Sequence, residues 1–188
     1  GVWLLGSGRH VDDSWCDRVN PYAGIDALGL EPLARGWGNS HSPALAEHIA
    51  RARVVIEVGS FQGASVAWMA AHNETARFYC VDTWLGSPEI SAEDMGGIGY
   101  QFGRPMLLER FLSNMVAAGI DDRVTPIIQT STSGAKILRA KGIAADLIYI
   151  DAGHDYLECY ADLVSYTPLL AQGGDLIADD YDGFPGVR

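Results

Sequence analysis

Three aspartates stand directly after predicted strands in the second half of the chain. Asp151 follows residues 147–150, and the pair Asp179 and Asp180 follows residues 175–178. The carboxyl ends of neighbouring parallel strands meet at one edge of a sheet, so we expect these carboxylates to converge there. Close carboxylates repel one another, and a divalent cation with oxygen ligands, such as Mg²⁺, would relieve the repulsion. The pattern predicts a metal site at Asp151, Asp179 and Asp180, unless these side chains cap helices or bind water.

A glycine turn is the second candidate for chemistry. Residues 57–65 read EVGSFQGAS, in which Gly59 and Gly63 bracket a change from strand to helix. Glycine permits a tight backbone path and close approach of a ligand, and the start of the following helix offers free N–H groups. The spacing Gly-x-x-x-Gly differs from the G-x-G-x-x-G of dinucleotide-binding turns. We therefore predict a turn that binds some other small ligand; a tight turn without a ligand is the alternative.

Asp82 and His154 are single residues at positions where chemistry is expected. Asp82 ends the predicted strand 78–81, where a carboxylate can accept both hydroxyl hydrogens of a ribose. Its alternative role is to cap the segment that follows. His154 stands three residues after Asp151 and is an ordinary surface histidine unless the nearby carboxylate and a substrate give it a role.

The elements that would position these residues are strands and helices in alternation. From about residue 53, short β-branched runs alternate with stretches of helical period, which predicts a doubly wound, mostly parallel α/β sheet with helices on both faces. The predicted strands are 54–58, 78–81, 124–128, 147–150 and 175–178. The predicted helices are 64–72, 106–118, 133–141 and 156–170. In the last helix, Leu157, Tyr160 and Val164 share one face, which is typical of a core-facing stripe.

Two stretches lack a sustained period. Residues 1–41 are predicted to form an irregular N-terminal segment, before a helix that begins near Ser42 and Pro43 and opens the domain of residues 42–188. Residues 86–105 are Gly-rich and polar, which predicts a functional lid or a mobile loop without secondary structure.

Composition excludes several classes of protein. The chain has 188 residues, 48% of them hydrophobic, which is enough for one sizeable core. A net charge of −11 without a basic cluster argues against nucleic-acid and membrane partners. Cys16, Cys80 and Cys159 are far apart and lack metal-type spacing, as reduced thiols would be. No apolar run approaches the roughly 18 residues that span a bilayer, and no secretory signal is evident, so we expect a cytoplasmic protein.

Longer runs resemble a known family. Residues 55–65, VIEVGSFQGAS, and residues 146–156, DLIYIDAGHDY, resemble class I S-adenosylmethionine (SAM)-dependent methyltransferases. Residues 81–88, VDTWLGSP, and 173–181, GGDLIADDY, are similar to the branch called the methyltransferase 24 family and to metal-dependent catechol and macrolide-sugar O-methyltransferases. The resemblance covers roughly residues 42–188 and implies a Rossmann-like fold.

The resemblance also implies roles for individual residues. Glu57 would help to hold the methionine part of SAM, Asp82 the ribose, and Ser131 the adenine. The whole implied cofactor set is Glu57, Gly59, Ser60, Gly63, Ser65, Asp82, Thr83, Ser131 and Asp151. A cation at Asp151, Asp179 and Asp180 would draw a substrate hydroxyl towards the methyl group and lower its pKa. His154 takes the place of a lysine base and could serve as base with Asp151, or equally contact the metal or the substrate.

These observations predict SAM-dependent O-methylation of a small hydroxylated molecule, assisted by a divalent metal. The alternatives are a metal-independent methyltransferase, a SAM-binding module without catalysis and, less favoured, a nicotinamide dehydrogenase. Trp37, His41 and Trp84 either line the acceptor pocket or pack in the core. Members of the family usually continue past the position of Arg188 through a helix and a β-hairpin, so we expect either a C-terminal truncation or an unusually short native protein. A homo-oligomer is compatible with the sequence.

Overall fold

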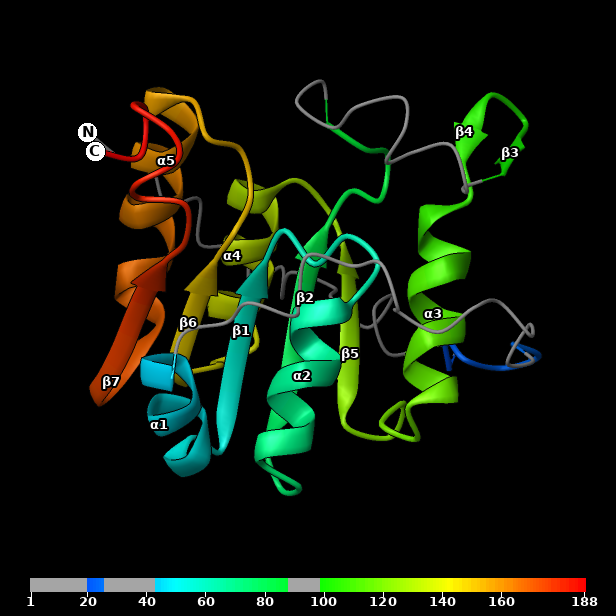
Figure 1. The fold of residues 1–188 in the computed structure, drawn as a ribbon, viewed down its shortest axis with the longest axis horizontal. Helices are drawn as coiled ribbons and strands as arrows, with labels where there is room; N and C mark the ends of the chain where they lie inside the picture. The colour runs from blue at the N-terminus through cyan, green and yellow to red at the C-terminus, as the bar shows by residue number, and fades with distance from the viewer. Residues whose placement is uncertain (1–19, 26–42, 88–98) are drawn as a thin grey trace, which may run out of the picture.

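A five-stranded parallel sheet with helices on both faces forms the centre of the molecule (Figure 1). The computed structural model describes residues 20–25, 43–87 and 99–188. The strand order is β5-β2-β1-β6-β7, and every neighbouring pair runs parallel. This confirms the predicted doubly wound fold. The strands are β1 (Val54–Val58), β2 (Arg77–Asp82), β5 (Val124–Ile128), β6 (Ala145–Ile150) and β7 (Leu170–Ala178).

The helices form two layers, one on each face of the sheet (Figure 1). The first layer contains α1 (Pro43–Arg51), α2 (Ala64–His72) and α3 (Leu107–Ala117). The second contains α4 (Ser131–Ala140), α5 (Tyr156–Tyr166) and a 3₁₀ turn (Thr167–Leu169). Successive residues of β1 point to opposite layers, so that Val55 belongs to the first core cluster and Ile56 to the second. Both faces of the central strands are therefore buried, as parallel sheets require.

Several predicted boundaries hold and others shift. Residues 54–58, 64–72 and 124–128 form the predicted elements. α4 begins at Ser131, two residues before the predicted start. The helix predicted for 156–170 is wrong at its end, because α5 stops at Tyr166 and Leu170 already belongs to β7. Pro168 explains this end, since proline lacks the N–H that a continuing helix needs.

The outward face of α5 carries the apolar stripe that the sequence suggested would be buried. Leu157, Tyr160 and Val164 are exposed by 70%, 57% and 55%. The inward face instead carries Asp162 and Tyr166, both buried. The Ser131 hydroxyl donates to Asp162, and the Tyr166 hydroxyl donates to the Ser131 carbonyl at 2.8 Å. Polar contacts to α4, which periodicity does not reveal, therefore decide which face of α5 turns inward.

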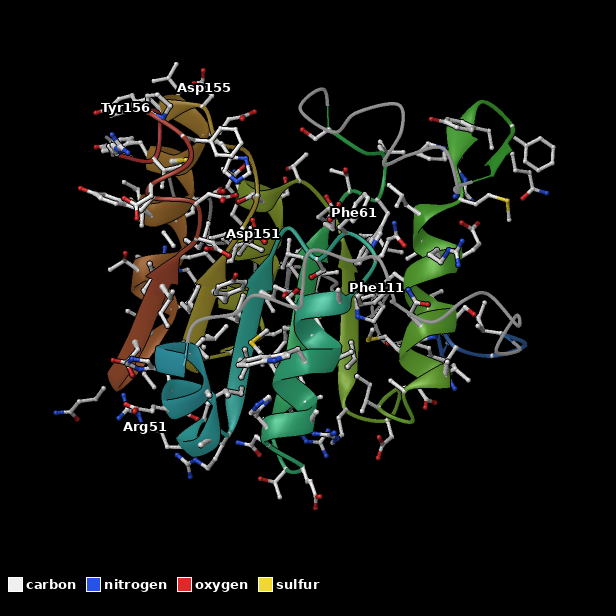
Figure 2. The ribbon with its side chains drawn as sticks, viewed as in Figure 1. Arg51, Phe61, Phe111, Asp151, Asp155 and Tyr156 are labelled. Carbon is white, nitrogen blue, oxygen red and sulfur yellow. The ribbon has the colours of Figure 1, made fainter. Side chains whose placement is uncertain are left out.

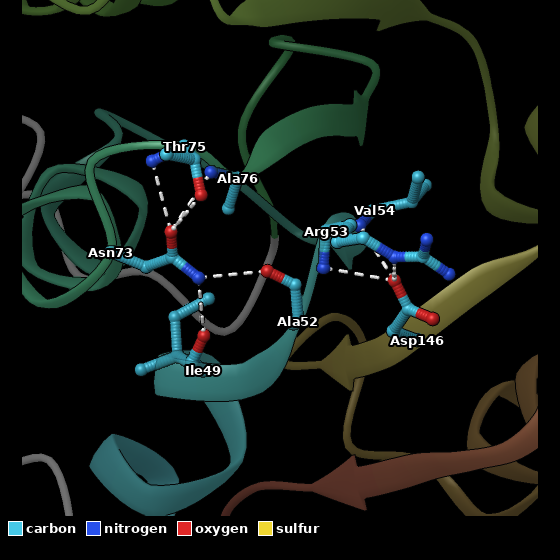
Figure 3. Close-up of polar contacts among 8 residues, drawn as sticks. All are labelled: Ile49, Ala52, Arg53, Val54, Asn73, Thr75, Ala76 and Asp146. Carbon is cyan, nitrogen blue, oxygen red and sulfur yellow. Dashed lines mark hydrogen bonds and ion pairs between the residues drawn. The ribbon is translucent and has the colours of Figure 1, made fainter.

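The amino ends of the strands are tied together away from the candidate site (Figure 3). The Asn73 amide donates to the carbonyls of Ile49 and Ala52, at 2.8 and 2.7 Å. The Asp146 carboxylate accepts the backbone N–H groups of Arg53 and Val54, at 2.8 and 3.0 Å. These contacts fix where β1 begins relative to α1, α2 and β6.

The predicted unstructured loop of residues 86–105 contains a small hairpin. β3 (Tyr100–Gln101) pairs antiparallel with β4 (Arg104–Pro105). Phe102 and Gly103 both have positive φ, 52° and 77°, as a two-residue hairpin turn requires. The prediction is thus corrected for residues 99–105, while residues 88–98 lie outside the described part.

Other sequence-based expectations meet the structure only in part. Cys16, Trp37 and His41 lie outside the described residues, while Cys80 is buried and Cys159 is partly buried. None of the helices within residues 20–25, 43–87 and 99–188 combines the length and apolar character that crossing a bilayer requires.

Candidate functional site

The carboxyl ends of four neighbouring strands are joined by backbone hydrogen bonds. Gly59 N donates to Val81 O at 2.9 Å, and Asp151 N donates to Val58 O at 2.8 Å. Asp179 N continues the series by donating to Ile150 O at 2.9 Å. The chain runs outward in opposite directions from β1 and from β6, so the switch point at which ligands bind in such sheets lies between Gly59 and Asp151. Figure 2 shows Asp151 and Phe61 at this edge and Arg51 at the opposite end of the molecule.

The glycine turn is fixed by its surroundings. Gly59 has φ 89°, and a Cβ there would lie 1.9 Å from the Asp151 carbonyl oxygen. Gly63 has φ 83°, and its Cβ would lie 2.4 Å from Met115 Cε. Only glycine fits either position without displacement of its neighbours. The turn is consequently held against the loop after β6 on one side and against α3 on the other.

Glu57 lies beneath this turn and has no exposed surface. Its Oε1 accepts a hydrogen bond from the Ser65 hydroxyl in the first turn of α2. The Ser60 hydroxyl is nearby, but neither it nor Glu57 Oε2 makes a hydrogen bond of normal geometry with a described residue. Burial raises the pKa of Glu57 to about 8, against the opposing effect of the two serine hydroxyls. In this structure Glu57 orients the partly exposed Ser65, which is the residue a ligand can reach.

Asp82 organises the loops around the end of β2. Its two carboxylate oxygens accept the backbone N–H groups of Phe61, at 2.8 Å, and Trp84, at 2.7 Å. Burial raises the pKa of Asp82, while these backbone donors lower it. The backbone N–H groups of Thr83 and Ser60 also lower it, so the carboxylate faces backbone donors from both loops. Asp82 therefore has the capping role that the sequence offered as one of its two alternatives.

The side chains of Thr83, Trp84 and Ser131 all contact other groups of the protein. The Thr83 hydroxyl accepts from Leu85 N at 3.2 Å. The Ser131 hydroxyl donates a hydrogen bond to the Asp162 carboxylate. The chain near Ser131 does reach Asp82, because Gln129 N donates to the Asp82 carbonyl oxygen. Trp84 is buried and packs against Phe111 with ring centroids 4.8 Å apart. Trp84 thus has the packing role, and the Ser131 hydroxyl bridges α4 and α5.

Asp151, His154 and Asp180 form a cluster of three ligand-type side chains. One ligand atom from each lies within 4.8 Å of the others. His154 Nε2 is 3.0 Å from Asp180 Oδ2 and 3.7 Å from Asp151 Oδ1. Burial and then Asp151 raise the pKa of Asp180, and His154 opposes this shift. Asp180 also has a positive φ of 59°, an uncommon backbone conformation that places its side chain here.

Asp179, the remaining predicted ligand, is not part of this cluster. Its Oδ2 accepts the Tyr149 hydroxyl and its Oδ1 accepts Asp180 N at 2.9 Å. Tyr149 is 2% exposed, and its burial and the hydrogen bond to Asp179 raise its pKa, so the hydroxyl remains a donor. The sequence analysis did not identify Tyr149, which lies in β6 two residues before Asp151.

The segment after β7 folds over His154. The Phe184 ring stacks on the His154 ring, with centroids 4.2 Å apart and planes inclined by 16°. Gly186 is packed so closely that a Cβ would lie 2.3 Å from the His154 carbonyl oxygen. His154 and Val187 line a small pocket that also includes Asp151 and Asp179.

The chain is similar to a known protein family. The protein-family model described as a methyltransferase domain matches residues 56–181. No curated protein matches the chain significantly. The matched residues include the glycine turn, Asp82 and the Asp151–His154–Asp180 cluster.

Solved structures share the fold at low sequence identity. An O-methyltransferase from Bacillus cereus in complex with SAH is 20% identical, with 95% of this chain and 69% of that chain covered and a TM-score of 0.54. The Streptomyces achromogenes O-methyltransferase TomG, involved in tomaymycin synthesis and in complex with SAM, is 18% identical, with 75% and 56% covered and a TM-score of 0.54. An O-methyltransferase family protein from Burkholderia thailandensis is 19% identical, with 72% and 35% covered and a TM-score of 0.53. The chain thus spans between 35% and 69% of these structures.

Proposed function

Because the chain belongs to the methyltransferase domain family, we propose that it transfers the methyl group of SAM to an oxygen of a small hydroxylated molecule, assisted by a divalent cation. One observation carries the proposal. Gly59, at the turn suited to SAM, packs directly against the main chain of Asp151, which belongs to the cluster suited to the cation. A methyl donor on one side of this contact and an acceptor oxygen on the other would be neighbours.

SAM offers groups that match the polar residues along the glycine turn. The free N–H groups at the start of α2 suit the carboxylate of its methionine part. The carboxylate of Asp82, at the end of β2, suits the ribose hydroxyls, which would share its oxygens with the backbone donors. Ser65, oriented by Glu57, adds a hydroxyl at the first turn of α2. The two fold neighbours solved with SAM or SAH support this choice of ligand.

The residues of the Asp151–His154–Asp180 cluster fit a divalent cation. Two carboxylates and one imidazole are common metal ligands, and each contributes an atom to one small region. A bound cation would lower the pKa of an acceptor hydroxyl and hold its oxygen in place. Asp151 and Asp180 would hold the cation, and their negative charge would be balanced by it.

Methyl transfer requires little covalent chemistry from the protein. The acceptor oxygen, the methyl carbon and the departing sulfur must be nearly collinear, and fixing that geometry is the main contribution of the site. The Gly59–Asp151 contact and the backbone hydrogen bonds between strand ends make this edge stiff.

A transfer assay tests the proposed function. The purified chain is incubated with methyl-labelled SAM and a panel of catechols, phenols and sugar alcohols, with Mg²⁺, with Mn²⁺ or with EDTA. We expect label in an acceptor only when a cation is present, and loss of at least about 100-fold in Asp151→Asn. Glu74→Gln, an exposed acid at the other end of the sheet, is the matched control and should retain activity. Turnover that survives both EDTA and Asp151→Asn would identify a metal-independent methyltransferase instead.

A further inference from the structure

We propose that the cation site is built from two carboxylates and one imidazole, and that it prefers a first-row transition metal such as Mn²⁺ or Zn²⁺ to Mg²⁺. The third ligand is His154, in the place where the sequence suggested Asp179. This inference rests on the proposed function, because it concerns the cation of that site.

The first observation is that Asp179 is already committed. One of its carboxylate oxygens accepts the hydroxyl of the buried Tyr149 and the other accepts Asp180 N. These contacts engage both carboxylate oxygens of Asp179. A cation that recruited Asp179 would have to compete with a buried hydrogen bond, which is costly to leave unmade.

The second observation is the placement of His154. Two ligands at right angles on an ion, each about 2.1 Å away, are separated by roughly 3 Å. His154 Nε2 is 3.0 Å from Asp180 Oδ2, which matches this spacing, and 3.7 Å from Asp151 Oδ1, so that Asp151 would move closer when an ion binds. Stacking on Phe184 and the close packing of Gly186 against the His154 main chain hold the ring in this orientation.

The donor atoms then determine the metal. Mg²⁺ prefers oxygen ligands and retains water, whereas imidazole suits Zn²⁺, Fe²⁺ and other transition metals. Replacing one carboxylate oxygen by an imidazole nitrogen also lowers the negative charge of the site, which reduces its attraction for Mg²⁺. A simple ion pair between His154 and the carboxylates would give the same distances without a preference among metals, so the preference is what has to be measured.

Calorimetric titration of the metal-free chain with MnCl₂, ZnCl₂ and MgCl₂ measures the preference among metals, and it does not require turnover. We expect Mn²⁺ and Zn²⁺ to bind at least about tenfold more tightly than Mg²⁺. His154→Ala should weaken Mn²⁺ and Zn²⁺ by about tenfold or more and change Mg²⁺ much less. His72→Ala, an exposed histidine on α2, is the matched control and should change none of them. In addition, Co²⁺ bound to the wild type should show a visible absorption spectrum that shifts in His154→Ala.

A second variant tests the role of Tyr149. Tyr149→Phe removes the hydrogen bond that holds Asp179, so Mg²⁺ affinity should rise relative to Mn²⁺. Equal binding of Mg²⁺ and Mn²⁺, unaffected by His154→Ala, would overturn the inference, as would the absence of any binding. SAH is titrated into the same samples: SAH binding without a metal preference refutes this inference alone, whereas loss of both SAH and metal binding refutes the proposed function as well.

Discussion

Glu57 shows how burial changes the chemistry of a single residue. Its pKa is raised to about 8 mainly by burial, so the folded protein keeps a proton that the unfolded chain releases near its ordinary value of 4.5. A group whose acid form is favoured by folding contributes stability below its unfolded pKa and loses it as the pH rises towards the folded pKa. Between about pH 4.5 and 8, therefore, Glu57 makes the fold progressively less stable.

Glu57→Gln should remove this dependence, because the amide stays neutral and can still accept from Ser65. Relative to the variant, the wild type should lose stability from pH 5 to pH 8, by an amount on the order of a few kcal/mol, and change little above pH 8.5. Urea unfolding across this range provides the comparison. Parallel pH profiles of the two proteins would show that Glu57 is already ionised in the folded state.

Residue types and spacing were enough to predict that the candidate residues lie at one edge of the sheet, but not which groups each of them contacts. Asp82, Asp151 and Asp180 lie at the expected edge of the sheet. Asp179 does not join Asp151 and Asp180, because its partner Tyr149 comes from a different strand. Pairings of this kind depend on side-chain contacts between elements distant in sequence, which one-dimensional patterns do not encode.

At the scale of elements, the glycine turn carries the most demanding geometry. Gly59 and Gly119 both have positive φ, but a Cβ at Gly119 would meet nothing within 4 Å, whereas one at Gly59 would meet the Asp151 backbone. Gly119→Ala should therefore cost only the conformational penalty, roughly 1–2 kcal/mol. Gly59→Ala should cost at least about 2 kcal/mol more, since the backbone must move.

The free energies of unfolding of both variants, measured in urea, test this difference. Similar losses in the two would mean that the loop after β6 yields easily and that the Gly59–Asp151 contact is not a stiff joint. The result also bears on function, because SAH affinity should fall in Gly59→Ala and stay near the wild-type value in Gly119→Ala.

Elements with one dominant signal were predicted well, and elements with competing signals were not. β1, β5 and α2 have the bounds that the sequence predicted, although Pro126 lies within β5. The end of α5 failed because helical period continued past Pro168. Its apolar stripe also suggested the wrong buried face, since contacts from Ser131 to Asp162 and Tyr166 turn the polar side inward.

For the whole molecule, alternation of strands and helices was sufficient to predict the parallel sheet and its two helical layers. Right-handed connections leave few topologies for such a chain, and the order β5-β2-β1-β6-β7 is one of them. That order then places the glycine turn, Asp82 and Asp151 at one edge. We propose that this edge binds the nucleoside part and the methionine part of SAM.

Calorimetric titration with SAH, with NAD as the control ligand, tests that claim most directly. We predict a dissociation constant on the order of micromolar for SAH, no binding of NAD, and SAH binding weakened about tenfold or more in Asp82→Asn. Glu74→Gln should bind SAH as the wild type does. Binding of NAD in place of SAH, or an Asp82→Asn variant with unchanged affinity for SAH, would contradict the account.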